Sequence, residues 1–125
     1  MTDSDVYGAI GEAGFASLAG AFYAQVPGDD ILGPMYPGGD LSEPEERLRD
    51  FLVGRFGGPA RYAERRGHPR LRARHVPFPI DQAASSRWVT LMERALDQAA
   101  LAPEADARLR AFFRDTASFL INRRA

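Results

Sequence analysis

Two histidines are the side chains in this sequence best suited to bind a metal, and both lie in an arginine-rich stretch. His75 follows Leu71 by four residues, which puts the two on one helical face, and neutral imidazole is a good ligand for iron. Taken alone, His75 is also compatible with a capping or core role. His68 lies between Gly67 and Pro69, a context that predicts a structural or surface position.

Other catalytic chemistry lacks the residues that it needs. The chain has no cysteine, which excludes thiolate catalysis and cysteine-ligated zinc or iron–sulfur sites. It also has no HExxH, GxGxxG or P-loop motif, and no serine in a nucleophile elbow. Glu43, Glu45 and Glu46 fall in the first turn of an expected helix, where the helix dipole accounts for them without catalysis.

Arginine supplies all 16 basic side chains of the sequence. Six of them fall within residues 61–74, and only Glu64 offsets them: Arg61, Arg65, Arg66, Arg70, Arg72 and Arg74. Three interpretations compete, namely a solvated face, recognition of a small anionic molecule, and RNA binding. The formal net charge of -1 disfavours a dedicated nucleic-acid binder and gives no reason to expect attraction to an anionic membrane.

Three aromatic residues with polar hydrogens fall in or beside apolar stripes: Tyr23, Tyr36 and Trp88. Each is compatible with plain core packing. A buried tyrosine or tryptophan nevertheless needs a hydrogen-bond partner, so three such donors converging on one cavity would form a ligand pocket.

The elements that must position these residues are predicted to be helices. Apolar residues at intervals of three and four predict one helix from after Ser4 to Val26, one from Ser42 to the Gly57-Gly58-Pro59 break, one over about 81–100 and one opening at Pro103. Residues 27–41 form a loop rich in proline and glycine, and 60–79 is short helical material. Gly11 and Gly14 mark a bend, and Ser42 with Glu45 reads as a capping box.

The chain is therefore expected to be one all-α domain over residues 1–125. Alternating β-branched runs, internal repeats and linkers are missing from the sequence. The N-terminus does not read as a signal peptide, and no apolar run reaches the roughly 20 residues of a membrane span. We expect a cytoplasmic protein.

The run FGGPARYAERRGHPRLRARHVPFPI at 56–80 resembles the corresponding segment of group II truncated haemoglobins. The resemblance extends to AFYAQV at 21–26, MYP at 35–37, EERLRDFL at 45–52 and Trp88. It implies a two-over-two helical sandwich around haem b, with His75 as the proximal iron ligand. Tyr23, Tyr36 and Trp88 fall where this family places its distal polar residues.

The resemblance also implies a set of haem-contacting residues. They are Pro44, Leu48, Phe51, Leu52, Phe56, Tyr62, Leu71, Arg72, Arg74, Phe78 and Met92, with Tyr62, Arg72 and Arg74 as candidates to meet the propionates. Two positions depart from the pattern. Pro44 stands where the family usually has a small non-proline residue, and Gly54 weakens its helix by about 1 kcal/mol relative to alanine.

The implied activity is the binding of oxygen, and of carbon monoxide or nitric oxide, at ferrous iron. One distal hydrogen bond would slow oxygen release by ~10–100-fold, which suits an enzyme or a sensor better than oxygen transport. Nitric oxide dioxygenase or peroxidase-like chemistry would need an external electron donor. The alternatives are a non-haem helical module binding RNA or another anionic partner through 61–74, and a plain helical interaction protein.

Overall fold

The computed structural model describes residues 1–36 and 38–123, and this part of the chain contains helices and no strand. The helices are α1 (Val6–Gln25), α2 (Ser42–Arg55), α3 (Arg61–Arg66), α4 (Leu71–His75), α5 (Gln82–Ala99) and α6 (Pro103–Phe119), with 3₁₀ turns at Asp3–Asp5, Val26–Gly28 and Gly33–Met35. The all-α prediction is confirmed. Of the described helices, none is both long and apolar enough to cross a membrane.

Helix α1 bends where the sequence predicts it. Gly11 has φ 66° and ψ −176° inside the helix, a backbone conformation that costs glycine little. Beyond the bend, Phe15, Leu18 and Phe22 are fully buried. This part of α1 packs against α5 and α2, so Tyr23 is held at the end of a firmly anchored helix.

Helix α2 begins at the predicted residue but not with the predicted cap. Leu41 occupies the N-cap position, and the capping box of Ser42 with Glu45 is wrong. The backbone N–H of Ser42 instead donates to Oδ1 of Asp40 at 3.0 Å. The helix ends before Gly57, whose φ is 101° and whose missing Cβ would lie 1.9 Å from the carbonyl oxygen of Ser4.

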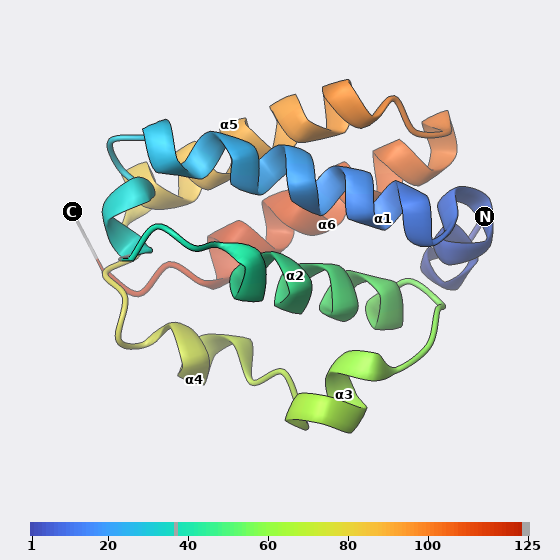
Figure 1. Ribbon diagram of the computed structural model, residues 1–125, viewed down its shortest axis with the longest axis horizontal. Helices are drawn as coiled ribbons and strands as arrows, with labels where there is room; N and C mark the ends of the chain where they lie inside the picture. Colours follow the sequence, from blue (N-terminus) through green and yellow to red (C-terminus); the bar gives the residue numbers. More distant parts are fainter. Residues whose placement is uncertain (37, 124–125) are drawn as a thin grey trace.

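The four long helices form two layers, with α1 and α2 in front of α5 and α6 in Figure 1. Aromatic contacts join the layers. Phe51 of α2 and Phe56, directly after it, meet Phe112 of α6 with ring centroids 6.3 and 5.1 Å apart. The short helices α3 and α4 lie along the outer side of α2 (Figure 1). The two-over-two arrangement agrees with the expectation from the sequence, and α4 is placed so that His75 can face inward.

Candidate functional site

A cavity of about 720 Å³ lies between the helix layers and α4. This volume is within the roughly 300–1,000 Å³ of small-molecule pockets. Eleven of the residues predicted from the sequence line it: Tyr23, Tyr36, Pro44, Leu48, Phe51, Tyr62, Leu71, Arg74, His75, Phe78 and Trp88. These residues come from α1, the loop after it, α2, α3, α4, the segment after α4, and α5, so the fold gathers side chains that are distant in sequence.

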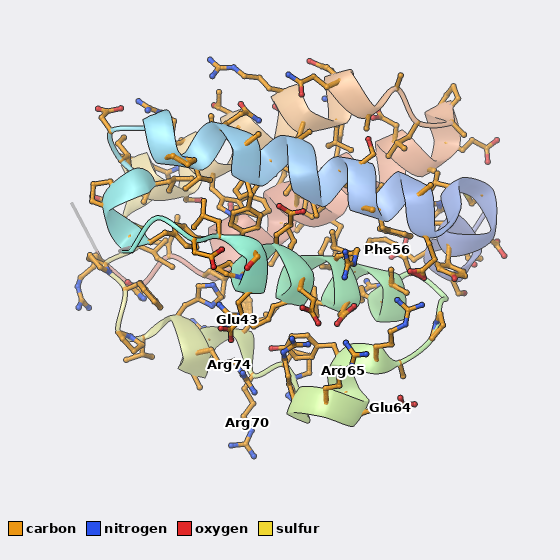
Figure 2. The ribbon with its side chains drawn as sticks, viewed as in Figure 1. Glu43, Phe56, Glu64, Arg65, Arg70 and Arg74 are labelled. Atoms are coloured by element: carbon orange, nitrogen blue, oxygen red, sulfur yellow. The ribbon has the colours of Figure 1, made fainter. Side chains whose placement is uncertain are left out.

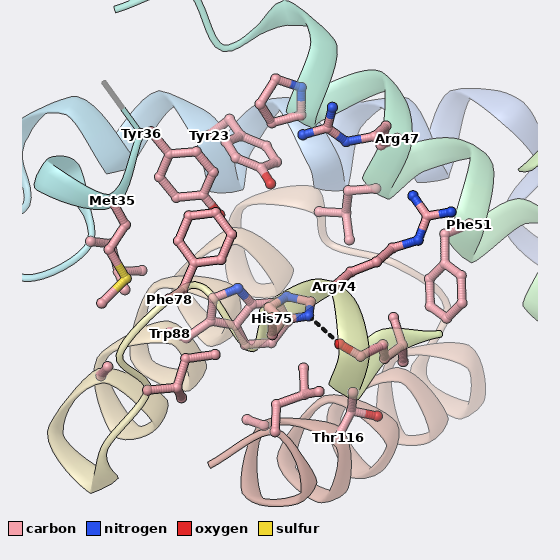
Figure 3. A pocket seen from close by; sticks show the side chains of 18 of the residues that line it. Tyr23, Met35, Tyr36, Arg47, Phe51, Arg74, His75, Phe78, Trp88 and Thr116 are labelled. Atoms are coloured by element: carbon pink, nitrogen blue, oxygen red, sulfur yellow. Dashed lines mark hydrogen bonds between the residues drawn. The ribbon is translucent and has the colours of Figure 1, made fainter. Parts of the chain in front are cut away.

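His75 is the last residue of α4 and is half-buried at the cavity wall. Its Nδ1 atom lies 2.6 Å from the carbonyl oxygen of Leu71, the contact drawn as a dashed line in Figure 3. A carbonyl oxygen only accepts, so Nδ1 carries the proton and donates it. The lone pair of the neutral ring therefore lies on Nε2, the nitrogen left to act as a metal ligand.

The predicted distal donors meet in the cavity from three elements (Figure 3). The rings of Tyr23 and Tyr36 are edge to face at 5.7 Å. Burial raises the pKa of the Tyr23 hydroxyl far above its usual value, and the neighbouring Tyr36 raises it further. Tyr23 therefore stays protonated and remains a hydrogen-bond donor. Trp88 packs against Phe22 at 5.2 Å, and its indole N–H has no hydrogen-bond partner among the described residues.

Two arginines line this cavity, and Figure 3 draws the Arg74 guanidinium toward Phe51 and that of Arg47 toward Tyr23. Arg74 precedes the histidine and donates from Nη2 to the carbonyl oxygen of Arg66 at 3.0 Å, and its guanidinium lies 5.8 Å from the Tyr62 ring centroid. Arg47 comes from α2 and was not predicted from the sequence. Both cations lie where an anionic edge of a ligand would meet them.

Four predicted contact residues are not among the described residues that line the cavity. Leu52, Phe56 and Met92 are fully buried in the core between the helix layers. Arg72 is exposed, and its guanidinium lies 4.7 Å from the ring centroid of Phe119. The structure therefore places these four residues in the core or at the surface, and their contacts with a haem stay a prediction.

Other residues that line the cavity were not predicted from the sequence. They are Leu32, Met35, Asp40, Leu41, Arg47, Ile80, Ala84, Ser85, Thr116, Ala117 and Leu120. Most are ordinary apolar or small residues in stripes that the sequence assigned to the core, or in the loop before α2. The loop before α2 carries apolar side chains between its prolines and glycines, a pattern that indicates packing but not a cavity.

Internal ion pairs account for three of the six arginines of 61–74. Arg61 binds Glu12 with a shortest contact of 2.6 Å, and Arg65 and Arg66 each lie 3.3 Å from Oδ2 of Asp50, which is 1% exposed. The Arg65 side chain lies between α3 and α2, whereas Arg70 points away from the molecule (Figure 2). Much of the arginine cluster at 61–74 thus forms ion pairs that hold α3 against α2, and it does not form a free basic surface.

The second histidine lies outside the cavity. His68 is exposed, and its Nδ1 accepts the backbone N–H of Arg70 at 3.0 Å. This agrees with the structural or surface position predicted for it. Among the described residues no three His, Asp or Glu side chains gather into a metal site. Of the two histidines, His75 is the one among the described residues that line the cavity.

Helices in two layers around an apolar cavity with one inward-facing histidine define a protein of the globin type. The model of the bacterial-like globin family matches residues 5–122, and the chain belongs to this family. Among curated proteins, the chain is 41% identical over 98 residues to the group 2 truncated hemoglobin YjbI of Bacillus subtilis, covering 78% of this chain and 74% of that protein.

Solved structures of similar proteins match almost the whole chain. A hemoglobin from Chloroflexus aurantiacus superposes with a TM-score of 0.91 at 42% identity, covering 94% of this chain and 98% of the other. A thermostable hemoglobin from Thermobifida fusca gives a TM-score of 0.89 at 44% identity, with 98% of both chains covered. These relationships support haem-based gas binding as the general function of the chain.

Proposed function

We propose that this chain binds haem b with His75 as the iron ligand from the protein and holds a diatomic gas in the part of the cavity lined by Trp88, Tyr23 and Tyr36. The observation that carries the proposal is the hydrogen bond from His75 Nδ1 to the Leu71 carbonyl oxygen at 2.6 Å, which leaves Nε2 as the ligating atom. A hydrogen-bonded second nitrogen is the usual arrangement for a metal-binding histidine.

The residues present fit this cofactor. Leu48, Phe51 and Leu71 supply apolar wall, and Arg47 and Arg74 supply cations for the two propionates, with the Tyr62 hydroxyl as a further donor. Covalent attachment through a CxxCH motif is excluded because the chain has no cysteine. Haem held by one imidazole supplies an open coordination position for oxygen, carbon monoxide or nitric oxide.

The chain's own contribution is to hold that gas by hydrogen bonds. The Trp88 indole donates only, whereas the hydroxyls of Tyr23 and Tyr36 can donate or accept. Each hydrogen bond to a ligand that has acquired negative charge stabilises it by about 1.5–3 kcal/mol. Pro44, which has no backbone N–H, and Leu48 give the same space an apolar wall on the α2 side.

Slow release of the gas favours sensing or redox chemistry over transport. Nitric oxide dioxygenase and peroxidase-like activity are the reactions consistent with such a site, and both draw electrons from an external donor. We also propose that residues 1–125 act as a single haem domain in the cytoplasm.

The test is the absorption spectrum of the protein reconstituted with hemin, compared with His75→Ala and with His68→Ala as the matched control. We expect a sharp Soret band that shifts on reduction and with carbon monoxide. It should weaken or change in His75→Ala and stay unchanged in His68→Ala. The absence of a Soret band after reconstitution would overturn the proposal, and the arginine-rich segment 61–74 would then be examined for binding of RNA or another anionic partner.

A further inference from the structure

The helix that carries His75 is poorly anchored by burial. Helix α4 has five residues, and none of them is buried. The chain that follows is also open, with Val76 62% and Phe78 41% exposed. Apolar packing therefore supplies little of the free energy that holds this segment in place, and specific hydrogen bonds must fix its position.

Asn122, just beyond the end of α6, supplies those bonds. Its Nδ2 donates to the carbonyl oxygens of His75 and Phe78, both at 3.0 Å, and its Oδ1 accepts the N–H of Ile80 at 2.9 Å. The backbone N–H of Asn122 also donates to the Ile80 carbonyl oxygen at 2.8 Å. One half-buried residue thus binds both ends of the 75–80 segment.

Only an amide on a side chain as short as that of asparagine matches the backbone groups that face residue 122. The site asks for two donated hydrogens and one acceptor on a short side chain, and Asn provides all three. Aspartate keeps the acceptor but turns an oxygen toward two carbonyl oxygens. The choice of asparagine therefore follows from the backbone groups that it faces.

We infer that Asn122 is a positioning residue that sets the orientation of the His75 imidazole from the far end of the chain. The inference rests on the proposed role of His75. The carbonyl of His75 accepts from Asn122 Nδ2 and from the backbone N–H of Phe78, which fixes the last turn of α4. The same helix α6 brings Thr116 and Leu120 to the cavity wall, so α6 determines both a wall of the pocket and the place of the ligand.

The test uses Asn122→Ala and Asn122→Asp in the holoprotein, with Arg123→Ala as the matched control. The Arg123 side chain makes one hydrogen bond among the described residues, to the Asn122 carbonyl oxygen at 3.4 Å. The readouts are the iron–histidine stretching frequency of the ferrous protein by resonance Raman spectroscopy and the rate of hemin transfer to apomyoglobin. Exchange of the Ile80 amide hydrogen in the haem-free protein is the third readout, and it does not depend on the cofactor.

We expect Asn122→Ala to shift the stretching frequency and to accelerate hemin loss by ~10–100-fold, as for other residues that orient a metal ligand. Arg123→Ala should change neither. Ile80 exchange should be slower in Asn122→Asp than in Asn122→Ala, because the acceptor of the Ile80 N–H remains. Hemin loss from Asn122→Asp should be at least as fast as from Asn122→Ala. Circular dichroism shows whether each variant is folded. If Asn122→Ala is unfolded, the test is made with Asn122→Asp.

Two results would overturn the inference, and they are distinguishable. Faster Ile80 exchange with the parent stretching frequency and hemin transfer rate would mean that Asn122 orders the loop without positioning the ligand. A parent protein with no iron–histidine band, or a band that persists in His75→Ala, would overturn the proposed function itself, and the inference with it.

Discussion

The imidazole of His75 is tied to the carbonyl oxygen of Leu71, one helical turn earlier, by a contact of 2.6 Å from Nδ1. The bond determines both the tautomer and the ring plane, and it leaves the lone pair on Nε2. This relationship can be tested separately from the presence of the histidine, because free imidazoles can replace a side chain that has been removed.

The first prediction concerns His75→Gly reconstituted with hemin and an added ligand. Imidazole can donate to the Leu71 carbonyl, whereas 1-methylimidazole cannot. A neutral hydrogen bond contributes about 1 kcal/mol, so we expect imidazole to restore the parent spectrum at ~5–10-fold lower concentration. Spectral titrations with both ligands measure the ratio, and the same titrations of hemin without protein are the control. If the ratio of the two ligand concentrations were the same with and without protein, the hydrogen bond to Leu71 would contribute nothing.

The second prediction concerns Trp88. It lines the cavity, and its ring packs between Phe22 and Phe113, at 5.2 and 5.4 Å. Trp88→Phe keeps an aromatic ring in this place and removes the donor. We expect the oxygen dissociation rate to rise by ~10–100-fold, with a smaller change for carbon monoxide, which acquires less negative charge. Stopped-flow dissociation of both gases measures this, and an unchanged oxygen rate would remove Trp88 from the set of donors.

The third prediction follows from the raised pKa of Tyr23, whose main cause is burial. An unfolded chain loses this proton near pH ~10, whereas the folded protein keeps it. The unfolded state then binds fewer protons, so this contribution to stability is complete below pH ~10 and is lost as the pH rises above it. In urea unfolding at increasing pH, the free energy of unfolding should fall more steeply for the parent than for Tyr23→Phe. Equal slopes above pH ~10 would contradict the burial of the hydroxyl.

Much of the fold was predictable because prolines, glycines and a capping aspartate divide the chain at the helix ends. Asp81, Pro103 and Gly57 lie at or beside the observed boundaries of α5, α6 and α2. The bend at Gly11 was predictable for the same reason. The cap of α2 was not, since Asp40 binds the backbone from two residues before the helix and leaves Ser42 inside it.

The site was predictable only in part because periodicity does not distinguish a cavity wall from a core. Leu48 and Phe51 line the cavity, while Leu52 on the same helix and Phe56 directly after it are buried in the core. Arg47 was missed because Glu43, four residues before it, makes it read as a surface ion pair, which it also forms at 2.8 Å. The role of Asn122 could not be predicted from the sequence, because its side-chain partners are backbone groups more than forty residues away.

The fourth prediction compares two arginines on α4 that the sequence treated alike. Arg74 lines the cavity, whereas Arg72 stacks on Phe119. Because Arg74 is exposed, we expect Arg74→Ala to weaken haem binding by only about 0.5–1 kcal/mol, or roughly 2–5-fold in hemin loss. The effect should shrink at high salt. Hemin transfer to apomyoglobin measures it, and Arg72→Ala is the matched control. An equal effect of both variants would mean that charge near α4, not contact with the propionates, controls retention.

The last prediction contrasts two glycines at the end of α2. Gly54 is inside the helix, and an added Cβ would lie 3.5 Å from the Pro59 carbonyl oxygen, an ordinary contact, so Gly54→Ala should stabilise the fold by about 0.4–1 kcal/mol. Gly57 has φ 101° and no room beside Ser4, so Gly57→Ala should cost at least about 2–3 kcal/mol. Urea unfolding of both variants measures the difference. A destabilised Gly54→Ala would show that this glycine serves helix motion or close packing, and a tolerated Gly57→Ala would contradict the contact between the α2 end and the N-terminal turn.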